Sequence, residues 1–510
     1  MIPGCATPAA TTAFAAQHPD SQFNLLGATD LSVSAAGFGG YRISAGVAAH
    51  ARALEKAFTG GVNLVDTSSN YADGGSERLV GEVLANLIQA GRLSRDQVVV
   101  ISKGGYLQGS NYTLSQERKA AGNPFEDIVE YADGLEHCIH PGFLEDQIGR
   151  TLERLGLATL DGYLLHNPEY FLGWAHRQKM APDRARETYY QRIDLAFRHL
   201  ETEVAGGRIR FYGVSSNTFA GSPDDPEFTC LHRILEIAES IGRDHHFQVI
   251  QLPFNLLEPG AATEPNQPDG RTVLQLARDE RLGLLTNRPL NAFSGNRMVR
   301  LASIAVRSRL DYATIIARIK ELAHSETRLW RKVLPGIDAI PGGLKVRIKQ
   351  QGCFAESIKH HWRSFGSYER WREAKDGIFL PRIQGVFDFL APLADAYPDL
   401  ADWIPFHRKT IERAFEAVAS IYADDAVALE KKITGLIDRA DDDWSRPGTL
   451  SRRAIRALVS TAGVSTVLVG MRREAYVAEV LAELKEPVEK RDRTAAWQRV
   501  QSGIADLFAR

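Results

Sequence analysis

The sequence predicts an α/β fold, a closed (β/α)8 TIM barrel, because short apolar segments alternate with amphipathic ones along its first part. Seven such strand-then-helix units fill residues 35–287, and an eighth helix and strand follow at 450–470 after a gap. The strand segments are too uniformly apolar to keep one face in water, so they suit a parallel sheet buried on both faces. Eight units favour a closed barrel over an open doubly wound sheet.

The elements follow in order from these patterns. The predicted strands are 35–40, 62–66, 97–102, 160–166, 209–215, 247–252, 282–287 and 464–470. The predicted helices are 47–59, 77–89, 144–156, 193–207, 231–242, 272–283 and 450–463, where apolar residues recur at helical spacing. Residues 23–34 are predicted to form a β-hairpin that caps the N-terminal end of the barrel.

A segment at 291–447 interrupts the pattern after strand seven and is far longer than an ordinary loop. Its stretches 312–324, 383–398, 410–423 and 426–440 have helical periodicity and enough apolar residues to bury, so a mostly helical subdomain is expected. Its aromatic runs at 360–373 and 402–406 are interpreted as its own core, with a lid over a substrate pocket as the alternative. A smaller insertion follows strand three, at 107–141.

The domain organisation that follows has four parts. Residues 1–20 are rich in small residues and lack the charged and apolar regions of a signal peptide, so a flexible N-terminal arm is expected. The barrel takes 21–290 and 448–490, the helical insertion takes 291–447, and a C-terminal helical tail takes 491–510.

Composition excludes several classes of partner. A formal charge of −2 and a pI near 6.7 give no electrostatic reason to expect nucleic acid or an anionic membrane as partner. No apolar stretch approaches the ~18 residues of a membrane span. The four cysteines are scattered without a CxxC pair, which argues against a thiolate zinc site and suits a reducing cytoplasm. No sequence feature specifies an oligomeric state.

Paired histidines at 245–246 and 360–361 do not predict a metal site. Neighbouring residues diverge by about 100° on a helix and face opposite sides of a strand, so the two rings cannot easily share one ion. We therefore expect no bound metal.

Four polar side chains lie at or just after the ends of successive strands. Asp66 ends the second strand, Tyr71 lies in the loop after it, Lys103 ends the third strand and His166 ends the fourth. Because the carboxyl ends of barrel strands converge on one rim, these side chains can meet despite their separation in sequence. Taken alone, each has an ordinary explanation, such as an N-cap for the aspartate; four together indicate an active site.

The four residue types are chemically complementary. A tyrosine with a pKa near 10 exchanges protons poorly at neutral pH, and a nearby lysine ammonium is expected to lower that pKa. Asp66 can pair with Lys103 and keep it charged, while a neutral His166 can donate a hydrogen bond to a carbonyl oxygen. The set predicts an acid–base group built around one proton on Tyr71.

These motifs resemble the aldo-keto reductase superfamily. The matching segments, in family order, are GFGGYRI (37–43), GVNLVDTSSNYADGGSERLVGEVL (61–84), VVVISKGG (98–105), LDGYLLHNPE (160–169), RIRFYGVSSNTF (208–219), FQVIQLPFNLLE (247–258) and VSTVLVGMRR (464–473). The insertion at 291–447 is not part of the usual pattern.

The resemblance implies a catalytic tetrad of Asp66, Tyr71, Lys103 and His166, with Tyr71 as general acid or base. It also implies a nicotinamide cofactor, NADP or alternatively NAD, bound without a Rossmann domain. The residues implied for the cofactor are Gly40, Tyr41 and Asp66 near the nicotinamide ribose, Ser215, Ser216, Asn217 and Gln251 at the carboxamide, Leu290 and the 291–297 loop at the pyrophosphate, and Gly470, Arg472 and Arg473 at the 2′-phosphate. Asn287 stands where the family often has an aromatic residue stacked on nicotinamide.

The function expected from this resemblance is reversible hydride transfer between NADP(H) and an aldehyde, ketone or sugar. Two other functions use the same features: a nicotinamide-binding redox sensor whose insertion contacts another protein, and a lyase or isomerase that oxidises its substrate transiently.

Overall fold

A computed structural model describes residues 1–294, 297–303, 310–486 and 488–508 of the chain. By its internal contacts the chain divides into two compact units. The barrel unit comprises Met1–Arg297 and Leu436–Arg510, and the helical unit comprises Met298–Gly435. Among the described residues, no helix combines the length and apolar character needed to cross a membrane.

The barrel unit contains the predicted closed barrel of eight parallel strands. In order around the barrel they are β3 (Ala36–Gly39), β4 (Leu64–Asp66), β5 (Val99–Gly104), β9 (Leu160–His166), β10 (Ile209–Ser215), β11 (Phe247–Pro253), β12 (Gly283–Asn287) and β15 (Thr466–Val469). β15 pairs with β3 and closes the ring. The fold prediction is confirmed, including the position of the long insertion between the seventh strand and the eighth.

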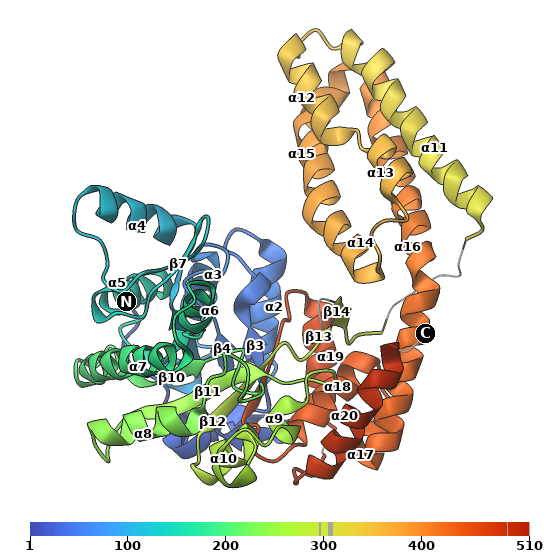
Figure 1. The fold of residues 1–510 in the computed structure, drawn as a ribbon. Coiled ribbons are helices and arrows are strands. Elements are labelled where there is room, and N and C mark those ends of the chain that lie inside the picture. Colours follow the sequence, from blue (N-terminus) through green and yellow to red (C-terminus); the bar gives the residue numbers. More distant parts are fainter. Residues whose placement is uncertain (295–296, 304–309, 487, 509–510) are drawn as a thin grey trace. The chain divides into compact units, whose positions relative to one another are not determined.

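Helices surround this barrel, and α7 and α8 lie along its outside in Figure 1. The helices that follow or precede the strands as predicted are α2 (Ala48–Thr59), α3 (Gly75–Gln89), α5 (Pro141–Leu155), α7 (Pro182–Ala205), α8 (Leu231–Ile241), α10 (Val273–Asp279) and α18 (Leu450–Val459). A short helix, α6 (Tyr170–Arg177), lies directly after the loop that follows β9. It packs against α7.

A hairpin closes the N-terminal end of the barrel, as the sequence predicts. Its strands β1 (Phe23–Leu25) and β2 (Ser32–Ser34) pair in antiparallel fashion. Leu26, Leu31 and Val33 are fully buried in one cluster with barrel residues such as Leu64 and Val99. The hairpin therefore supplies the apolar floor beneath the interior of the barrel.

The first twenty residues differ from the flexible arm expected from their composition. Residues Pro8–Gln17 form helix α1, which begins at a Thr7 N-cap and buries Phe14. The backbone N–H of Ala6 donates to Asp161 Oδ1 at 2.6 Å, and Ile2 bridges to Leu157. Small side chains can be ordered in this way because a buried carboxylate binds their backbone, which composition alone does not reveal.

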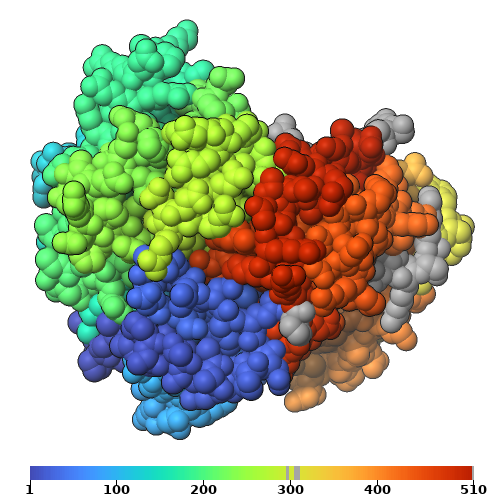
Figure 2. Space-filling view, turned by 90° about the horizontal axis from the view of Figure 1, so that it is seen from below, coloured from blue at the N-terminus to red at the C-terminus, as the bar shows by residue number. Residues whose placement is uncertain are grey.

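The C-terminal part of the barrel unit packs against its N-terminal part, and Figure 2 shows the two segments, red and blue, side by side on one face. Helix α19 (Glu474–Leu484) ends where the Gln22 N–H donates to the Leu484 carbonyl oxygen at 3.1 Å. Helix α20 comprises Thr494–Phe508. The fully buried Arg456 of α18 donates to Glu483 of α19 at 2.6 and 2.9 Å.

The smaller insertion after β5 forms a three-stranded antiparallel sheet and a helix. Its elements are β6 (Tyr106–Leu107), α4 (Ser110–Ala120), β7 (Val129–Ala132) and β8 (Leu135–His137), with β8 in the centre. This insertion brings His137 and Tyr106 next to the end of β9, where His137 Nε2 lies 2.8 Å from the His166 carbonyl oxygen.

The helical unit has its own core. Its larger helices are α11 (Tyr312–Arg328), α12 (Gly342–Gly352), α13 (Ala355–His361), α14 (Tyr368–Ala374), α15 (Leu380–Leu390) and α16 (Pro398–Ala440). Trp362, Trp371 and Trp403 are buried in one cluster within this unit, so the aromatic runs form its core as expected. A lid function stays a prediction. The stretches predicted at 410–423 and 426–440 are parts of one helix, α16.

Two short strands lie where the chain passes from the barrel unit to the helical unit: β13 (Asn291–Ser294), and β14 (Arg297–Arg300), within which the helical unit begins. The compact helical unit is shorter at both ends than the predicted 291–447 segment, because 291–297 and 436–447 group with the barrel unit. Trp444 shows why: it is fully buried, and its indole N–H donates to Ser460 Oγ at 2.9 Å.

Candidate active site

The structure brings the four strand-end residues together at the carboxyl end of the barrel. Asp66 is the last residue of β4, Lys103 lies near the end of β5, and His166 is the last residue of β9. The ring of Tyr71, in the loop after β4, meets the ring of His166 edge-on with centroids 5.9 Å apart. The Lys103 ammonium lies 5.0 Å from the centroid of the Tyr71 ring.

The turn that presents Tyr71 depends on the two glycines after it. Gly74 has a φ of +76°, a left-handed conformation that glycine adopts without strain, and helix α3 begins at Gly75. Glu77 then fixes α3 in place. It is fully buried and accepts hydrogen bonds from Ser102 Oγ at 2.6 Å, from Thr151 Oγ1 at 2.9 Å and from Arg154.

Lys103 and Asp66 form a buried ion pair. Lys103 Nζ donates to both carboxylate oxygens of Asp66 at 2.6 Å and to the Thr67 carbonyl oxygen at 2.9 Å. The lysine side chain is 0% exposed and that of Asp66 is 5% exposed. The three N–H bonds of the ammonium are thus directed at three protein acceptors. Burial lowers the pKa of Lys103, and the contact with Asp66 opposes that change.

The environment of Tyr71 corrects one expectation. Burial, followed by the charge of Asp66 and the neighbouring Tyr41, holds the pKa of Tyr71 well above its ordinary value. The expected lowering by Lys103 is wrong because Asp66 compensates the lysine charge and the phenol has lost much of its solvation. Tyr71 is therefore a neutral phenol across the physiological pH range, which is the form that can donate a proton.

His166 is held from several sides. Ser68 Oγ lies 3.0 Å from its Nδ1, and the ring of Tyr106 meets it edge-on at 4.7 Å. Burial, then the positive charge of Lys103 and then His137, keep the pKa of His166 well below its ordinary value. The imidazole is therefore neutral, as the sequence analysis expected, and can offer either a donor or an acceptor at Nε2.

Two of the residues expected at the carboxamide, Ser215 and Gln251, form a hydrogen-bonded row with Asn287 across neighbouring strand ends. His166 pairs with Ser215, and Ser215 pairs with Gln251, in the strand register. Gln251 Nε2 donates to Asp66 Oδ1 at 2.8 Å, and Gln251 Oε1 accepts from Asn287 Nδ2 at 3.2 Å. Asn287 thus joins Ser215 and Gln251.

Two other carboxamide candidates lie outside this row. Ser216 is buried, and its hydroxyl forms hydrogen bonds with Thr218 and Thr229. The side chain of Asn217 is exposed, while its backbone N–H donates to Glu169 Oε1 at 2.8 Å. The motif GVSSNTF thus places the side chain of Ser215, rather than that of either of the next two residues, against the Gln251 side chain.

The side chains present fit a nicotinamide carboxamide. Asn287 Oδ1 is buried and has no hydrogen-bond partner among the described residues, so an amide N–H at this place would satisfy it. Gly40 allows close packing nearby, because an added Cβ would lie 2.8 Å from the Asp66 carbonyl oxygen. Tyr41, next to it, is 65% exposed and its ring lies 5.2 Å from that of Tyr71.

The residues expected at the phosphates lie at two strand ends. Gly470 follows β15, and an added Cβ there would meet nothing within 4 Å, which leaves room for a ligand to approach the backbone. Burial lowers the pKa of His50, and the positive charges of Arg472 and Arg473 lower it further, so both arginines act near His50. Leu290 lies after β12 and is partly buried. Of the 291–297 loop, Gly295 and Asn296 lie outside the described residues.

A cavity of about 450 Å³ opens beside Tyr71. It is lined by Tyr41, Arg42, Ile43, Ser44, His50, Asn70, Tyr71, Ala72 and Gln108. Asn70 Nδ2 donates to Gln108 Oε1 at 3.3 Å, so two amides face this space together. The cavity contains a member of the tetrad and a histidine close to Arg472 and Arg473, which suits a pocket next to a bound cofactor.

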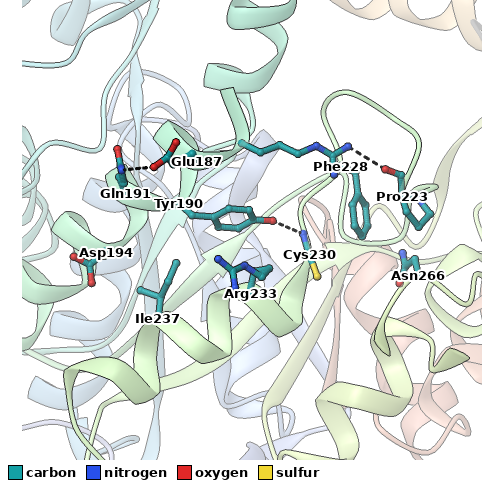
Figure 3. A pocket seen from close by; sticks show the side chains of 11 residues that line it. Glu187, Tyr190, Gln191, Asp194, Pro223, Phe228, Cys230, Arg233, Ile237 and Asn266 are labelled. Atoms are coloured by element: carbon teal, nitrogen blue, oxygen red, sulfur yellow. Dashed lines mark hydrogen bonds between the residues drawn. The ribbon is translucent and has the colours of Figure 1, made fainter. Parts of the chain in front are cut away.

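A second cavity, of about 760 Å³, lies between α7 and α8 on the side of the barrel (Figure 3). Tyr190 accepts a hydrogen bond from the Cys230 backbone N–H at 3.1 Å, and Arg186 donates to the Pro223 carbonyl oxygen at 3.0 Å. None of the tetrad residues line this cavity. It is separate from the candidate active site.

Several residues around His166 were not singled out from the sequence. Asn167 has a φ of +52°, a conformation that asparagine tolerates, and its Nδ2 donates to the Tyr106 hydroxyl at 2.7 Å. Glu169 is 2% exposed, and its Oε2 has no hydrogen-bond partner among the described residues. Polar residues directly after a strand-end histidine were the available signal, in the stretch LLHNPE (164–169).

Glu169 gives a prediction about stability and pH. Burial raises the pKa of Glu169 to about 7, above its ordinary 4.5. The folded protein therefore binds this proton more tightly than the unfolded chain, so the stability from this group is complete below about pH 4.5 and is lost as pH rises through about 7. We expect Glu169→Gln to match the wild type at pH 4 and to exceed it by up to about 3 kcal/mol at pH 8 in urea unfolding. Glu117→Gln, at an exposed position on α4, is the control; an equal gain there would contradict the assignment.

Comparisons with known proteins agree with the aldo-keto reductase resemblance found in the sequence. Residues 36–224, which contain the whole tetrad, match the family model described as the aldo/keto reductase family. The resemblance found in the sequence is thereby confirmed for residues 36–224.

Two curated relatives cover parts of this chain. The chain is 30% identical over 149 residues to an NADH-specific methylglyoxal reductase of Escherichia coli, a match that covers 28% of this chain and 40% of that protein. It is 31% identical over 149 residues to an L-galactose dehydrogenase of Arabidopsis thaliana, covering 28% of this chain and 46% of that protein. The chain thus spans less than half the length of either relative.

Solved structures are also similar. An aldo/keto reductase from Klebsiella pneumoniae in complex with NADP and acetate has 20% sequence identity and a TM-score of 0.33, covering 53% of this chain and 69% of that one. A glycerol dehydrogenase from Gluconobacter oxydans has 14% identity and a TM-score of 0.45, covering 96% of this chain and 95% of that one.

Proposed function

We propose that the protein is an NADP(H)-dependent oxidoreductase that reversibly interconverts a carbonyl compound and an alcohol, with Tyr71 as general acid and base. The single observation that carries this proposal is the grouping of Tyr71, His166 and the buried Lys103–Asp66 pair at one rim of the barrel. A cytoplasmic location and a small-molecule substrate, without nucleic acid or membrane, form part of the proposal.

Different residues transfer the proton and orient the substrate. His166 binds the substrate oxygen from one side, and Tyr71 gives that oxygen a proton in reduction or takes it in oxidation. The Lys103–Asp66 pair holds both charges in fixed positions next to the phenol. When bound, the nicotinamide supplies or receives the hydride. Ser215, Gln251 and Asn287 would hold its carboxamide, an assignment supported by the unsatisfied Asn287 oxygen.

Polar side chains in the cavity beside Tyr71 support a substrate that carries hydroxyl groups. Asn70, Gln108, Ser44 and His50 line it, and such side chains can exchange hydrogen bonds with several hydroxyls. Aldehydes, ketones and sugars of this kind are therefore the proposed substrate class. The two curated relatives act, by their names, on methylglyoxal and on L-galactose.

NADP is proposed in preference to NAD because two arginines follow β15. Arg472 and Arg473 both act on His50 electrostatically, so their positive charges reach one place. Paired guanidinium groups suit the 2′-phosphate that distinguishes NADP from NAD. Because one relative is named as NADH-specific, the assay should compare NADPH with NADH.

The test is an assay of the purified full-length protein with NADPH and NADH against a panel of aldehydes, ketones and sugars. Oxidation of NADPH that depends on a hydroxylated carbonyl compound is the expected result. Tight NADPH binding without turnover would favour the redox-sensing alternative. Product formation without net change in cofactor would favour a lyase or isomerase.

The rates of reduction and oxidation should depend differently on pH. Because the pKa of Tyr71 is well above its ordinary value, the phenol is fully protonated at neutral pH, and its acid form is available for reduction. We expect kcat for reduction to be flat from about pH 6 to about pH 9, and kcat for oxidation to rise with pH over the same range. Initial rates at saturating cofactor measure both profiles. A fall in the reduction rate near pH 7 that persists in Glu169→Gln would contradict this assignment.

A further inference from the structure

Ser68 makes a hydrogen-bonding contact that the tetrad alone does not explain. Its Oγ lies 3.0 Å from His166 Nδ1, although the two residues are 98 positions apart in the chain. Ser68 is 0% exposed and lies in the loop between Asp66 and Tyr71. The short segment from Asp66 to Tyr71 therefore carries two of the four strand-end residues and the hydroxyl that contacts His166.

The contact with Ser68 bears on which ring nitrogen of His166 carries the proton. Burial keeps the ring neutral, so only one of its two nitrogens carries a proton. The hydrogen bond at one nitrogen determines which nitrogen that is. His137 contacts the His166 carbonyl oxygen and Tyr106 packs against the ring, so both position the imidazole without reaching Nδ1.

The Ser68 hydroxyl has one proton and three acceptors within reach. Asn70 Oδ1 lies at 2.7 Å, His166 Nδ1 at 3.0 Å and the Lys103 carbonyl oxygen at 3.2 Å. Asn70 is in turn bonded to Gln108, 3.3 Å away, and both amides line the cavity beside Tyr71. Rotating both amides by 180° exchanges donor and acceptor along this row, since amide oxygen and nitrogen have the same shape.

In the rotated order every donor in the row is directed toward His166. Gln108 then donates to Asn70, Asn70 donates to Ser68, and the Ser68 proton goes to Nδ1. The His166 proton is consequently on Nε2, where it can be donated to a carbonyl oxygen. With the opposite order Nδ1 carries the proton and Nε2 is an acceptor, which a carbonyl oxygen would not match.

We propose that Ser68 is a positioning residue that holds His166 in the Nε2–H tautomer when a carbonyl substrate is bound, with Asn70 and Gln108 ordering the Ser68 hydroxyl from the cavity wall. This role rests on the proposed carbonyl reduction. It also links the cavity to the tetrad, because the amides that would meet substrate hydroxyls are the same ones that orient Ser68.

The test compares Ser68→Ala with Ser69→Ala. Ser69 is the neighbouring buried serine, and its hydroxyl has no hydrogen-bond partner among the described residues. The ¹⁵N spectrum of histidine-labelled full-length protein, with NADPH and a carbonyl substrate or inhibitor added, reports the tautomer, and His166→Gln identifies the His166 signals. The wild type and Ser69→Ala should show a protonated Nε2, and Ser68→Ala should show a mixture.

Kinetics provide the second readout. We expect Ser68→Ala to reduce kcat/KM for carbonyl reduction about tenfold, the effect of one lost hydrogen bond, while NADPH affinity stays the same. Ser69→Ala should keep the wild-type value. An unchanged His166 tautomer in Ser68→Ala, or an equal kinetic loss in Ser69→Ala, would overturn the proposal. The tautomer can be measured whether or not the protein turns over, so failure of the proposed reaction is separable from failure of this role.

Discussion

Tyr71→Phe is expected to lose about 10²–10⁴-fold in kcat for both directions of the reaction. The variant keeps the ring that packs edge-on against His166 and Tyr41 but removes the only proton that Tyr71 can exchange. Lys103 cannot replace it, since its three N–H bonds are directed at Asp66 and Thr67. The measurement is the initial rate with NADPH and the best carbonyl compound of the panel.

Two controls make the Tyr71→Phe result specific. NADPH affinity, followed by fluorescence titration, should be nearly unchanged, because the carboxamide and phosphate candidates lie on other strand ends. Tyr112→Phe removes a hydroxyl from α4, outside the cavity that Tyr71 lines, and should keep wild-type activity. Retained turnover in Tyr71→Phe would show that another group moves the proton.

The barrel could be predicted because each strand is buried on both faces and carries its own apolar signal. All eight strands lie within two residues of their predicted bounds, and the strand ends then had to share one rim. The tetrad follows from the same geometry: Asp66, Lys103 and His166 are each at or near the end of a strand. Their residue types and their positions at strand ends were sufficient to predict that these three side chains lie close together.

The parts that could not be predicted depend on contacts between distant residues. Helix α1 is ordered by Asp161, a residue 155 positions from Ala6 along the chain. The pKa of Tyr71 depends on burial and on how completely Asp66 neutralises Lys103, which spacing does not reveal. In the sequence, Ser68 cannot be distinguished from other loop serines, because its contact with His166 exists only in the folded chain.

In the helical unit, the sequence pattern could not show where one helix ends and the next begins. Helical periodicity in 410–423 and 426–440 was visible, but nothing in the pattern required the two stretches to join. They are continuous in α16, which even contains Pro405 within its first turns. A proline at this place has no N–H to donate to the carbonyl oxygen four residues earlier, so the pattern gave no reason to expect an uninterrupted helix through it.

Lys103→Met is expected to be the most destabilising substitution in the site. It removes the positive partner of Asp66 and leaves a carboxylate buried without its main partner, which typically costs about 3–5 kcal/mol. Gln251 Nε2, at 2.8 Å, compensates only one carboxylate oxygen. We also expect turnover to be lost. Urea unfolding of the full-length protein measures the stability, and Lys359→Met, which breaks an exposed pair with Glu356, should cost less than about 1 kcal/mol.

The double variant Asp66→Asn/Lys103→Met separates the buried charge from the loss of packing. An amide and a thioether carry no net charge, so the double variant should be more stable than Lys103→Met alone, although it is also inactive. If both variants were equally destabilised, the cost would come from the lost lysine stem and not from the unpaired carboxylate. The expected result would show that the pair stabilises the fold through its charges, the same charges that in the proposed mechanism fix the electrostatic environment of Tyr71.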